Sequence, residues 1–312
     1  MKIIRKRRDI HHGDRYFYFL LKGLASGLPL LLFLIAAFLL KASWPTINEF
    51  GAAFLFTQDW DPVGEHFGVL AFAFGTIVSS LIAIAIGAPL SIFTALFLTE
   101  LASSRVAKVA GFLVEMLAAI PSVVYGLWGI FVLAPILRIH VEPFLGKTLG
   151  FLPLFQGPPY GVGMLAAGIV LAIMIIPTIT SVSREVFRSV PQSYREAAMA
   201  LGATRWEVMR IAVLKTGSTG ILGAVILGLG RALGETMAVT MVIGNRADIS
   251  ASLFSPAQTM SSVIANEYAE ATSATHVAAL LEIGLVLFLL TFIVNSLARV
   301  FVWRASLGRS AR

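Results

Sequence analysis

Residues 67–99 read FGVLAFAFGTIVSSLIAIAIGAPLSIFTALFLT and contain no charged side chain. A helix can cross the hydrocarbon core of a bilayer when about 20 consecutive residues are predominantly apolar. Five further stretches meet this requirement, namely residues 23–40, 109–137, 161–183, 219–245 and 276–298. The sequence therefore predicts an all-α, polytopic membrane protein with about six transmembrane helices.

The overall composition argues against a water-soluble enzyme. Of the 312 residues, 57% are hydrophobic and 13% are charged, whereas a soluble domain has about 25% charged residues. The first apolar stretch follows a basic segment, as the core of a signal peptide would. It lacks a clear small-x-small cleavage site and is too long for such a core, so we expect it to be retained as the first transmembrane helix.

Basic residues are distributed unevenly among the segments that connect the predicted spans. With the N-terminus inside, the inner segments hold 19 of the 24 Lys and Arg residues, the outer segments hold 4, and Arg231 lies within a span. The inner segments are residues 1–22, 100–108, 184–217 and 299–312, and the outer segments are residues 41–66, 138–160 and 246–275. Because cytoplasmic loops are enriched in Lys and Arg, both termini are predicted to be cytoplasmic. The division of basic residues among four separate segments argues against nucleic-acid binding.

The inner segment between the fourth and fifth spans has the pattern of two short helices. It reads SREVFRSVPQSYREAAMALGATRWEVMRIAVLKTG. Ser193 and Glu196 form one potential capping box, and Thr204 and Glu207 form another, so a helix is expected to begin at each. Gly202 lies between them, where a glycine typically ends a helix.

Apolar residues of the second expected helix recur at helical spacing. Trp206, Met209 and Val213 would share one face of it. Such a face suits a groove in a partner protein. It also suits a helix pair that lies at the membrane interface, and the pattern alone leaves both possibilities open.

This loop resembles the EAA loop of ABC importer permeases. The matching residues are Glu196, Ala197, Ala198, Gly202, Ile211 and Leu214. Two other blocks, AIPSVVYGLWG from residue 119 and GLGRALGETMAVTMVIGN from residue 228, look like phosphate-specific importer permeases. Residues 265–271 and 276–280 are similar to the C-type rather than the A-type subunit of that system. Lys215 departs from the pattern, because a proline usually stands there, and this affects the expected geometry of the loop exit.

The resemblance implies a type I permease fold in the bacterial inner membrane and ATP-driven import of inorganic phosphate by alternating access. It also implies a heterodimer with a sister A-type permease, two copies of a cytoplasmic ATPase, and an extracytoplasmic phosphate-binding protein. Closure of the ATPase pair would pull on residues 193–214 and so move the helices. The residues expected to couple to the ATPase are Glu196, Ala197, Ala198, Gly202 and Trp206.

No nucleotide-binding motif is present in the sequence. Gly146-Lys147-Thr148 resembles the end of a P-loop, but the motif also needs a glycine where Val141 stands. ATP and Mg²⁺ are therefore expected to be used by the partner ATPase, and we predict neither a catalytic residue nor a cofactor bound by this chain. A metal site is not predicted either, because cysteine is absent and no pair of the five histidines has HExxH spacing.

Arg231 is the most unusual residue of the predicted spans. Glu235 follows four residues later, so the two side chains would touch on one face of a continuous helix. The neighbouring Gly228, Gly230 and Gly234 would let another helix approach closely. In one interpretation the pair only fixes helix packing. In the other, which we favour because charges within membranes are usually functional, Arg231 lines an anion path and Glu235 holds it in place. A guanidinium presents a planar fork of donors that matches phosphate oxygens.

Other features of the spans and loops are interpreted structurally. Glu115 and Glu282 are assigned to packing or to the interface. Proline-rich residues 138–160 are expected to form an extended connector. Kinks are expected at the prolines within the spans, which are Pro89, Pro121 and Pro177.

These predictions divide the chain into three regions. Residues 1–66 comprise the basic N-terminal tail, the first helix and an outer loop. Residues 67–303 form the permease core with the coupling loop 184–217, and residues 304–312 form a cytoplasmic tail. An alternative function is a permease for another oxyanion, such as sulfate or molybdate. An alternative of a different class is an ion channel or membrane scaffold, which would need no ATPase.

Overall fold

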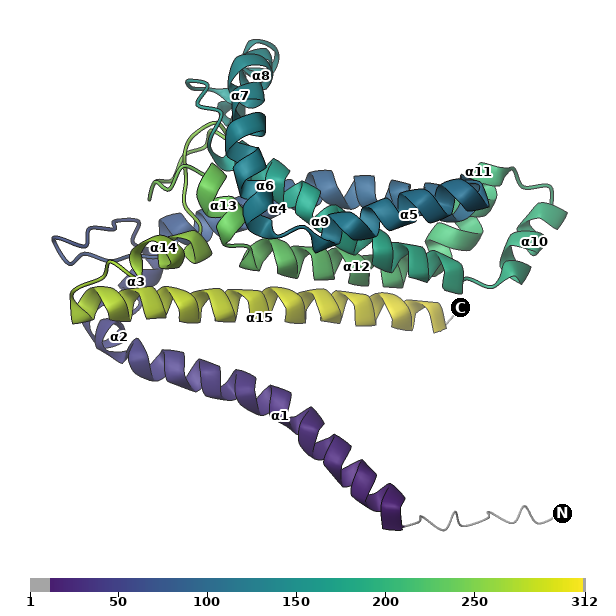
Figure 1. Cartoon of the computed structure of the whole chain (residues 1–312), viewed down its shortest axis with the longest axis horizontal. Helices are drawn as coiled ribbons and strands as arrows, with labels where there is room; N and C mark the ends of the chain where they lie inside the picture. Colours follow the sequence, from purple (N-terminus) through teal and green to yellow (C-terminus); the bar gives the residue numbers. More distant parts are fainter. Residues whose placement is uncertain (1–11, 311–312) are drawn as a thin grey trace.

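The computed structural model describes residues 12–310, and this part of the chain is almost entirely helical (Figure 1). The α-helices are α1 (His12–Ala42), α2 (Trp44–Phe50), α3 (Ala53–Phe56), α4 (Leu70–Leu96), α5 (Ser104–Ala119), α6 (Ser122–Trp128), α7 (Ala134–Ile136), α8 (Glu142–Leu149), α9 (Met164–Ser189), α10 (Gln192–Ala200), α11 (Arg205–Val208), α12 (Lys215–Gly234), α13 (Met237–Val242), α14 (Met260–Glu267) and α15 (Ala274–Ser310). Four π-helical segments continue them, namely η1 (Phe97–Leu101), η2 (Gly129–Leu133), η3 (Leu137–Val141) and η5 (Met209–Leu214), and η4 (Pro153–Phe155) is a 3₁₀ turn.

Six helical stretches of the described chain are long and apolar enough to cross a membrane, which confirms the predicted number. They are Arg15–Ala42, Leu70–Leu101, Ser122–Leu149, Met164–Ser189, Arg205–Gly234 and Ala274–Val300. The protein is therefore a multi-pass, all-α membrane protein. The basic residues of the predicted N-terminal tail before His12 lie outside the described residues, whereas α15 continues through most of the predicted C-terminal tail, as far as Ser310.

The third span differs from its prediction. Residues 109–137 do not form one helix, because α5 ends at Ala119 and α6 begins after Pro121. Ile120, which precedes the proline, has the extended backbone that a following proline favours (φ −69°, ψ 127°). Pro121 therefore marks a break rather than a kink within a helix.

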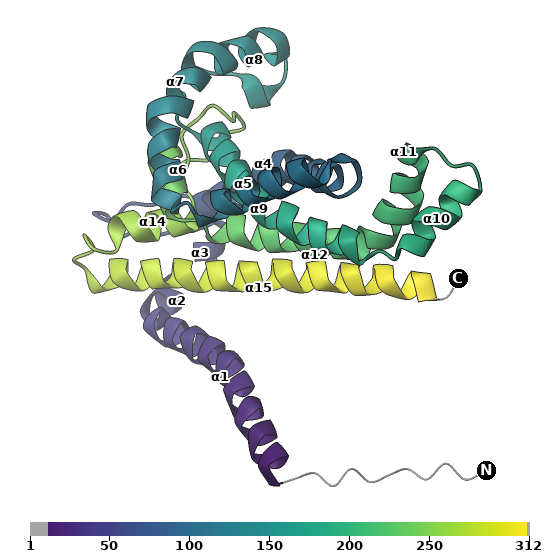
Figure 2. The same ribbon diagram turned by 45° about the vertical axis from the view of Figure 1, so that its right-hand side comes forward.

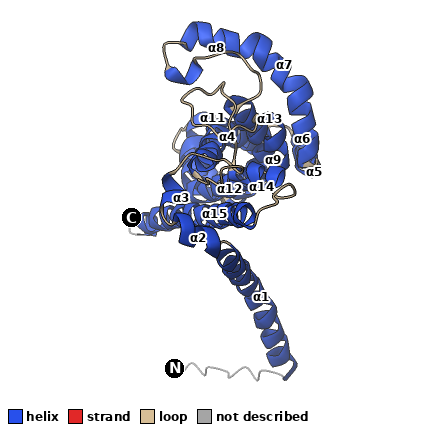
Figure 3. Ribbon diagram, turned by 90° about the vertical axis from the view of Figure 1, so that its left-hand side faces the viewer, coloured by secondary structure: helices blue, strands red, loops and turns tan. Residues whose placement is uncertain are grey.

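The helices after this break leave the main bundle. From α6 the chain runs through η2, α7, η3 and α8, and Figures 1 and 3 show this arm rising away from α9 and α12. The expectation of an extended connector over residues 138–160 is wrong for its first half, because the helical arm continues to Leu149. Pro143 lies in the first turn of α8, directly after the π-helical segment η3.

The core of the bundle consists of α4, α9 and α12, which lie side by side (Figure 2). Close approach of α4 and α9 depends on glycine, because a Cβ on Gly87 would lie 2.9 Å from a side-chain carbon of Ile175 and 3.1 Å from the carbonyl oxygen of Ala172. Pro89 and Pro177 lie inside these uninterrupted helices. Near them Ser91 Oγ donates to the carbonyl of Ile176 (3.3 Å), so a polar contact joins the two helices.

Two long helices border this core in different ways. The C-terminal helix α15 packs along α12, whereas α1 meets α15 near Gly284 and then diverges from it (Figures 1 and 2). The most apolar part of α1 has no buried residue in the described chain. A surface of this kind faces lipid or another subunit in a membrane protein.

Candidate functional site

Two interruptions of the helices lie close together beside α9. The first separates α5 from α6 at Ile120 and Pro121, and the second separates α12 from α13 at Glu235. The helices that follow the two interruptions, α6 and α13, pack directly on each other. A Cβ on Gly126 would lie 3.2 Å from Cα of Ala238 and 2.5 Å from Sδ of Met241. Irregular backbone within a membrane is tolerated where protein buries it or where it lines an aqueous cavity, so this region is the first candidate site.

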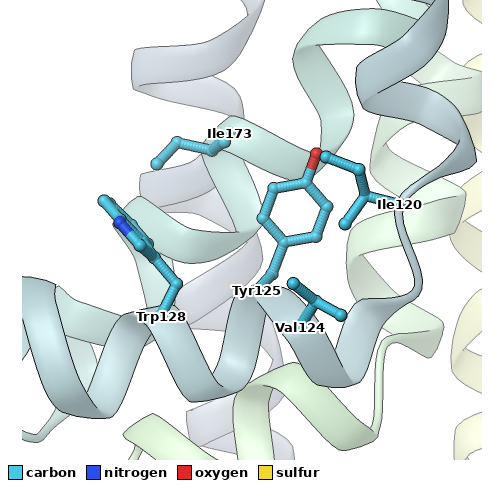
Figure 4. A pocket seen from close by; sticks show the side chains of 5 residues that line it. All are labelled: Ile120, Val124, Tyr125, Trp128 and Ile173. Atoms are coloured by element: carbon cyan, nitrogen blue, oxygen red, sulfur yellow. The ribbon is translucent and has the colours of Figure 1, made fainter.

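Tyr125 stabilises the first interruption. Its hydroxyl donates a hydrogen bond to the carbonyl of Leu117 at the end of α5 (2.8 Å), which also accepts one from the amide of Ile120 at 3.4 Å. The ring lies at the centre of a group of apolar side chains that line an open pocket of about 260 Å³ (Figure 4). The lining residues are Ile120, Val124, Tyr125, Trp128 and Ile173.

Arg231 lies in the last turn of α12, immediately before the second interruption, and is half-buried. Its Nη1 donates to Oγ1 of Thr178 on α9 at 3.1 Å. A cation at the C-terminal end of a helix interacts favourably with the helix dipole, which helps to hold the charge here.

The predicted contact between Arg231 and Glu235 is wrong. Glu235 has left the helix (φ −71°, ψ 130°), so the spacing of four residues no longer brings the two side chains together. The ion pairs of the described chain do not include this one. Instead the side-chain carboxylate of Glu235 accepts a hydrogen bond from the amide of Ala238 (3.4 Å). The backbone carbonyl of Glu235 accepts one from Ser261 Oγ (2.8 Å). Glu235 therefore stabilises the start of α13, and Thr178 is the residue that positions Arg231.

The three glycines around Arg231 have different surroundings. A Cβ on Gly228 would lie 2.6 Å from Cδ1 of Ile179, so this glycine permits the close packing of α12 on α9. Gly230 faces Asn295 of α15 at an ordinary contact distance of 3.7 Å. Gly234 has no neighbour within 4 Å in the described chain, so its predicted role in packing is wrong within this subunit.

The other two acidic residues of the spans have different surroundings. Glu115 pairs with Arg184 at 3.4 Å, and the arginine side chain is 8% exposed while the glutamate is 61% exposed. Glu282 is buried in α15. Neither residue lies at the junction of α6 and α13, where Arg231 stands.

The second candidate site is the pair of short helices α10 and α11 at the far end of the bundle (Figure 1). The predicted capping box at Thr204 is confirmed: its hydroxyl accepts from the amide of Glu207, and the Glu207 carboxylate accepts from the amide of Thr204. Gly202 ends the first helix in the left-handed conformation (φ 83°). The predicted box at Ser193 is wrong, because α10 begins one residue earlier, directly after Pro191, and has no side-chain cap.

The predicted common face of the second helix is also wrong. Met209 and Val213 are buried, but Trp206 is 52% exposed. Residues from Met209 onward adopt π-helical geometry, which has more residues per turn than an α-helix and changes the position of Val213 around the helix relative to Trp206. Lys215 connects this segment to α12 without interruption, since it supplies the N–H that the usual proline would lack.

The surface of α10 and α11 is therefore free to meet another protein. Glu196 and Ala197 are exposed and Ala198 is partly exposed. Large apolar side chains accompany them at exposed fractions of 51% or more, namely Tyr194, Met199, Leu201 and Trp206. An exposed apolar patch of this kind is typical of an interaction surface.

Comparison with known proteins identifies the family. Residues 87–306 match the family described as binding-protein-dependent transport system inner membrane component. The chain is 47% identical to the phosphate transport system permease protein PstC of Mesorhizobium japonicum over 274 residues, covering 86% of this chain and 84% of the relative. It is 47% identical to PstC of Pasteurella multocida over 279 residues, covering 88% and 87%. PstC of Xylella fastidiosa is 45% identical over 306 residues, covering 97% and 94%.

Solved structures show the same fold at low sequence identity. A bacterial alginate ABC transporter, in complex with an alginate-bound periplasmic protein, aligns with a TM-score of 0.60 at 14% identity, covering 93% of this chain and 96% of that chain. An inward-facing structure of the MetNI methionine ABC transporter aligns with a TM-score of 0.52 at 18% identity, covering 76% and 94%. With its six membrane-spanning helices and this likeness over most of its length, the chain belongs to the family of binding-protein-dependent transport system inner membrane components, as the permease subunit of an ABC importer.

Proposed function

We propose that this chain is the C-type permease subunit of a phosphate importer, and that Arg231 lines the path of the anion. The proposal is supported by the relatives of 45–47% identity, which are phosphate transport permeases. The observation that carries it is the position of Arg231 beside the junction of two interrupted helices, held by Thr178. Ligand sites in transporters commonly lie where transmembrane helices are interrupted.

The guanidinium of Arg231 is available for an anion. Its hydrogen bond to Thr178 uses one of the five N–H donors, and the described chain gives it no other hydrogen bond. Two parallel N–H groups of such a fork can donate to two phosphate oxygens at once. Because Glu235 does not neutralise it, the positive charge remains free to attract a phosphate ion.

The second site supports coupling to an ATPase. Permeases of this family work with an ATPase and a binding protein, and the exposed patch on α10 and α11 offers a docking surface for the former. We assign the contacts to Glu196, Ala197, Ala198, Gly202 and Trp206. ATP and Mg²⁺ would be used by that subunit, because the sequence lacks a P-loop.

The remaining features of the proposal concern assembly and orientation. The permease would pair with an A-type sister subunit and would bind two ATPase subunits on the cytoplasmic side. Both termini would be cytoplasmic in the bacterial inner membrane, as the excess of Lys and Arg in the inner segments favours. The phosphate-binding protein would deliver its ligand from outside, and alternating access would follow from movements of α10 and α11.

The experiment that tests this function is uptake of radiolabelled phosphate by the complete complex in proteoliposomes. Uptake is expected to require ATP and the binding protein, to stop with vanadate, and to persist in excess sulfate or molybdate. Strong competition by sulfate or molybdate would favour the alternative oxyanion permease. A purified complex that contains no ATPase and conducts ions without ATP would contradict the proposal and favour a channel.

A further inference from the structure

The helix α10 lies at the surface of the bundle. None of its residues is buried. The neighbouring η5 behaves differently, because Met209 and Val213 enter an apolar cluster with residues of α4 and α9, including Leu96 and Phe187. A force applied to α10 can therefore reach the bundle through its backbone connections, through its packing on α11 and η5, or through polar side chains.

One polar side chain makes this connection. Nε and Nη2 of Arg195 donate to the two carboxylate oxygens of Glu100 at 3.1 and 2.8 Å. Nη1 donates to the carbonyl of Val190 (2.7 Å), and Nη2 also donates to that of Phe187 (2.9 Å). Arg195 thus joins α10 to the end of η1 and to the carbonyls at the C-terminal end of α9.

The geometry makes this connection stiff. The side chains of Arg195 and Glu100 are 14% and 12% exposed, so solvent competes weakly for their hydrogen bonds. A bidentate pair fixes orientation as well as distance, which a single lysine ammonium cannot do. The backbone connection on the other side of α10 passes through Gly202, whose amide donates to the carbonyl of Met199 at 2.9 Å. That connection leads to α11 and η5, whereas the side chain of Arg195 links α10 directly to η1 and α9.

We infer that the Arg195–Glu100 pair is the joint that transmits movement of α10 to α4 and α9. Arg195 is then a positioning residue, since the ATPase would contact the exposed face of α10 and the bundle would respond through this pair. The inference deepens the proposed function and rests on its assignment of α10 to ATPase docking. Breaking the pair should separate ATP hydrolysis from movement of the bundle without preventing assembly.

The test uses the complete complex with three variants of this chain. Arg195→Lys retains the charge but removes the fork, and Glu100→Gln retains the shape but removes the charge. Arg188→Gln is the matched control, because Arg188 pairs with Glu185 nearby at 3.2 Å but both side chains are more than half exposed. Such exposed pairs contribute little to stability.

The first readout is the number of ATP molecules hydrolysed per phosphate taken up. Both joint variants are expected to assemble and to hydrolyse ATP, while this ratio rises roughly tenfold, as expected for loss of one charge-assisted hydrogen bond. The Arg188→Gln control should match the unmodified complex. An unchanged ratio in both assembled joint variants would overturn the inference. Loss of assembly, ATP hydrolysis and phosphate uptake together in both variants would also overturn it, because a pair that only stabilises the structure would give that result.

The second readout does not depend on the identity of the substrate. The chain contains no cysteine, so spin labels can be placed at Gln192→Cys on α10 and Phe93→Cys on α4, both of which are exposed and lie outside the proposed docking residues. The distance between the labels is expected to stay the same in the ATP-free and vanadate-trapped complexes, and to change between them with Arg195→Lys. If the distance between the labels also stays the same in the Arg195→Lys complex, the inference about the Arg195–Glu100 pair is wrong. Failure of the unmodified complex to import phosphate would instead contradict the proposed function.

Discussion

Replacing Thr178 with valine tests whether the position of Arg231 matters for transport. Thr178 provides the one hydrogen bond of the Arg231 guanidinium in the described chain, at 3.1 Å. A hydrogen bond to a charged group contributes about 1.5–3 kcal/mol. Because both residues are only half-buried, we take the lower value of about 1.5 kcal/mol, which corresponds to a roughly tenfold change in rate.

The assay is the initial rate of ATP-driven phosphate uptake in proteoliposomes, at saturating concentrations of the phosphate-loaded binding protein. Thr178→Val should lower the maximal rate roughly tenfold without reducing the amount of assembled complex. Thr178→Ser is the control, since it keeps the hydroxyl that accepts from Arg231, and it should transport close to the normal rate. Normal uptake by the valine variant would refute the reasoning, as would an equal defect in the serine variant.

Two further predictions concern packing and docking. In detergent, the protein with Gly228→Ala should melt at a lower temperature than the protein with Gly223→Ala. Both substitutions bring the same gain in helix propensity, but only Gly228 faces a close neighbour, Ile179. Overpacking of this kind costs about 1–3 kcal/mol of stability. Equal melting temperatures would contradict the close packing of α12 on α9. Trp206→Ala should weaken binding of the ATPase at least tenfold, as is typical of a central aromatic contact. The control is Phe151→Ala, which removes an exposed aromatic side chain far from α10. The complex with this control substitution should bind the ATPase normally. Equal affinities of the two variants would exclude Trp206 from the docking surface.

The features that sequence predicts well here are those set by local chemistry. The number of spans follows from the length and apolarity of the runs, which any bilayer requires. The turn between α10 and α11 follows from Gly202 and Thr204, because the left-handed glycine and the capping box act over only a few residues. These predictions are confirmed.

The predictions that failed depend on tertiary structure. An apolar run shows that residues can lie in a membrane but not that they form one helix. The apolarity of residues 219–245 therefore does not predict that α12 ends before Glu235. The break at Ile120 does carry one, since Pro121 disfavours helical backbone in the residue before it. The π-helical segment that begins at Met209 changes the position of Val213 around the helix relative to Trp206, and apolar periodicity does not indicate such a segment.

The polar partners of Arg231 and Arg195 could not be predicted from the sequence, because they are distant in the chain. Thr178 lies 53 residues before Arg231, and Glu100 lies 95 residues before Arg195. Each pair forms only because packing of α4, α9 and α12 brings distant segments together. Glu235, four residues from Arg231, was the nearer candidate in sequence and is the wrong one in space.

The most direct test of the central claim is phosphate uptake by a complex that carries Arg231→Ala. If Arg231 lines the anion path, this complex assembles with its sister permease, ATPase and binding protein but imports no phosphate. Arg231→Lys should restore only part of the uptake, because an ammonium keeps the charge but lacks the planar fork. Uptake at the normal rate by the assembled Arg231→Ala complex would contradict the account.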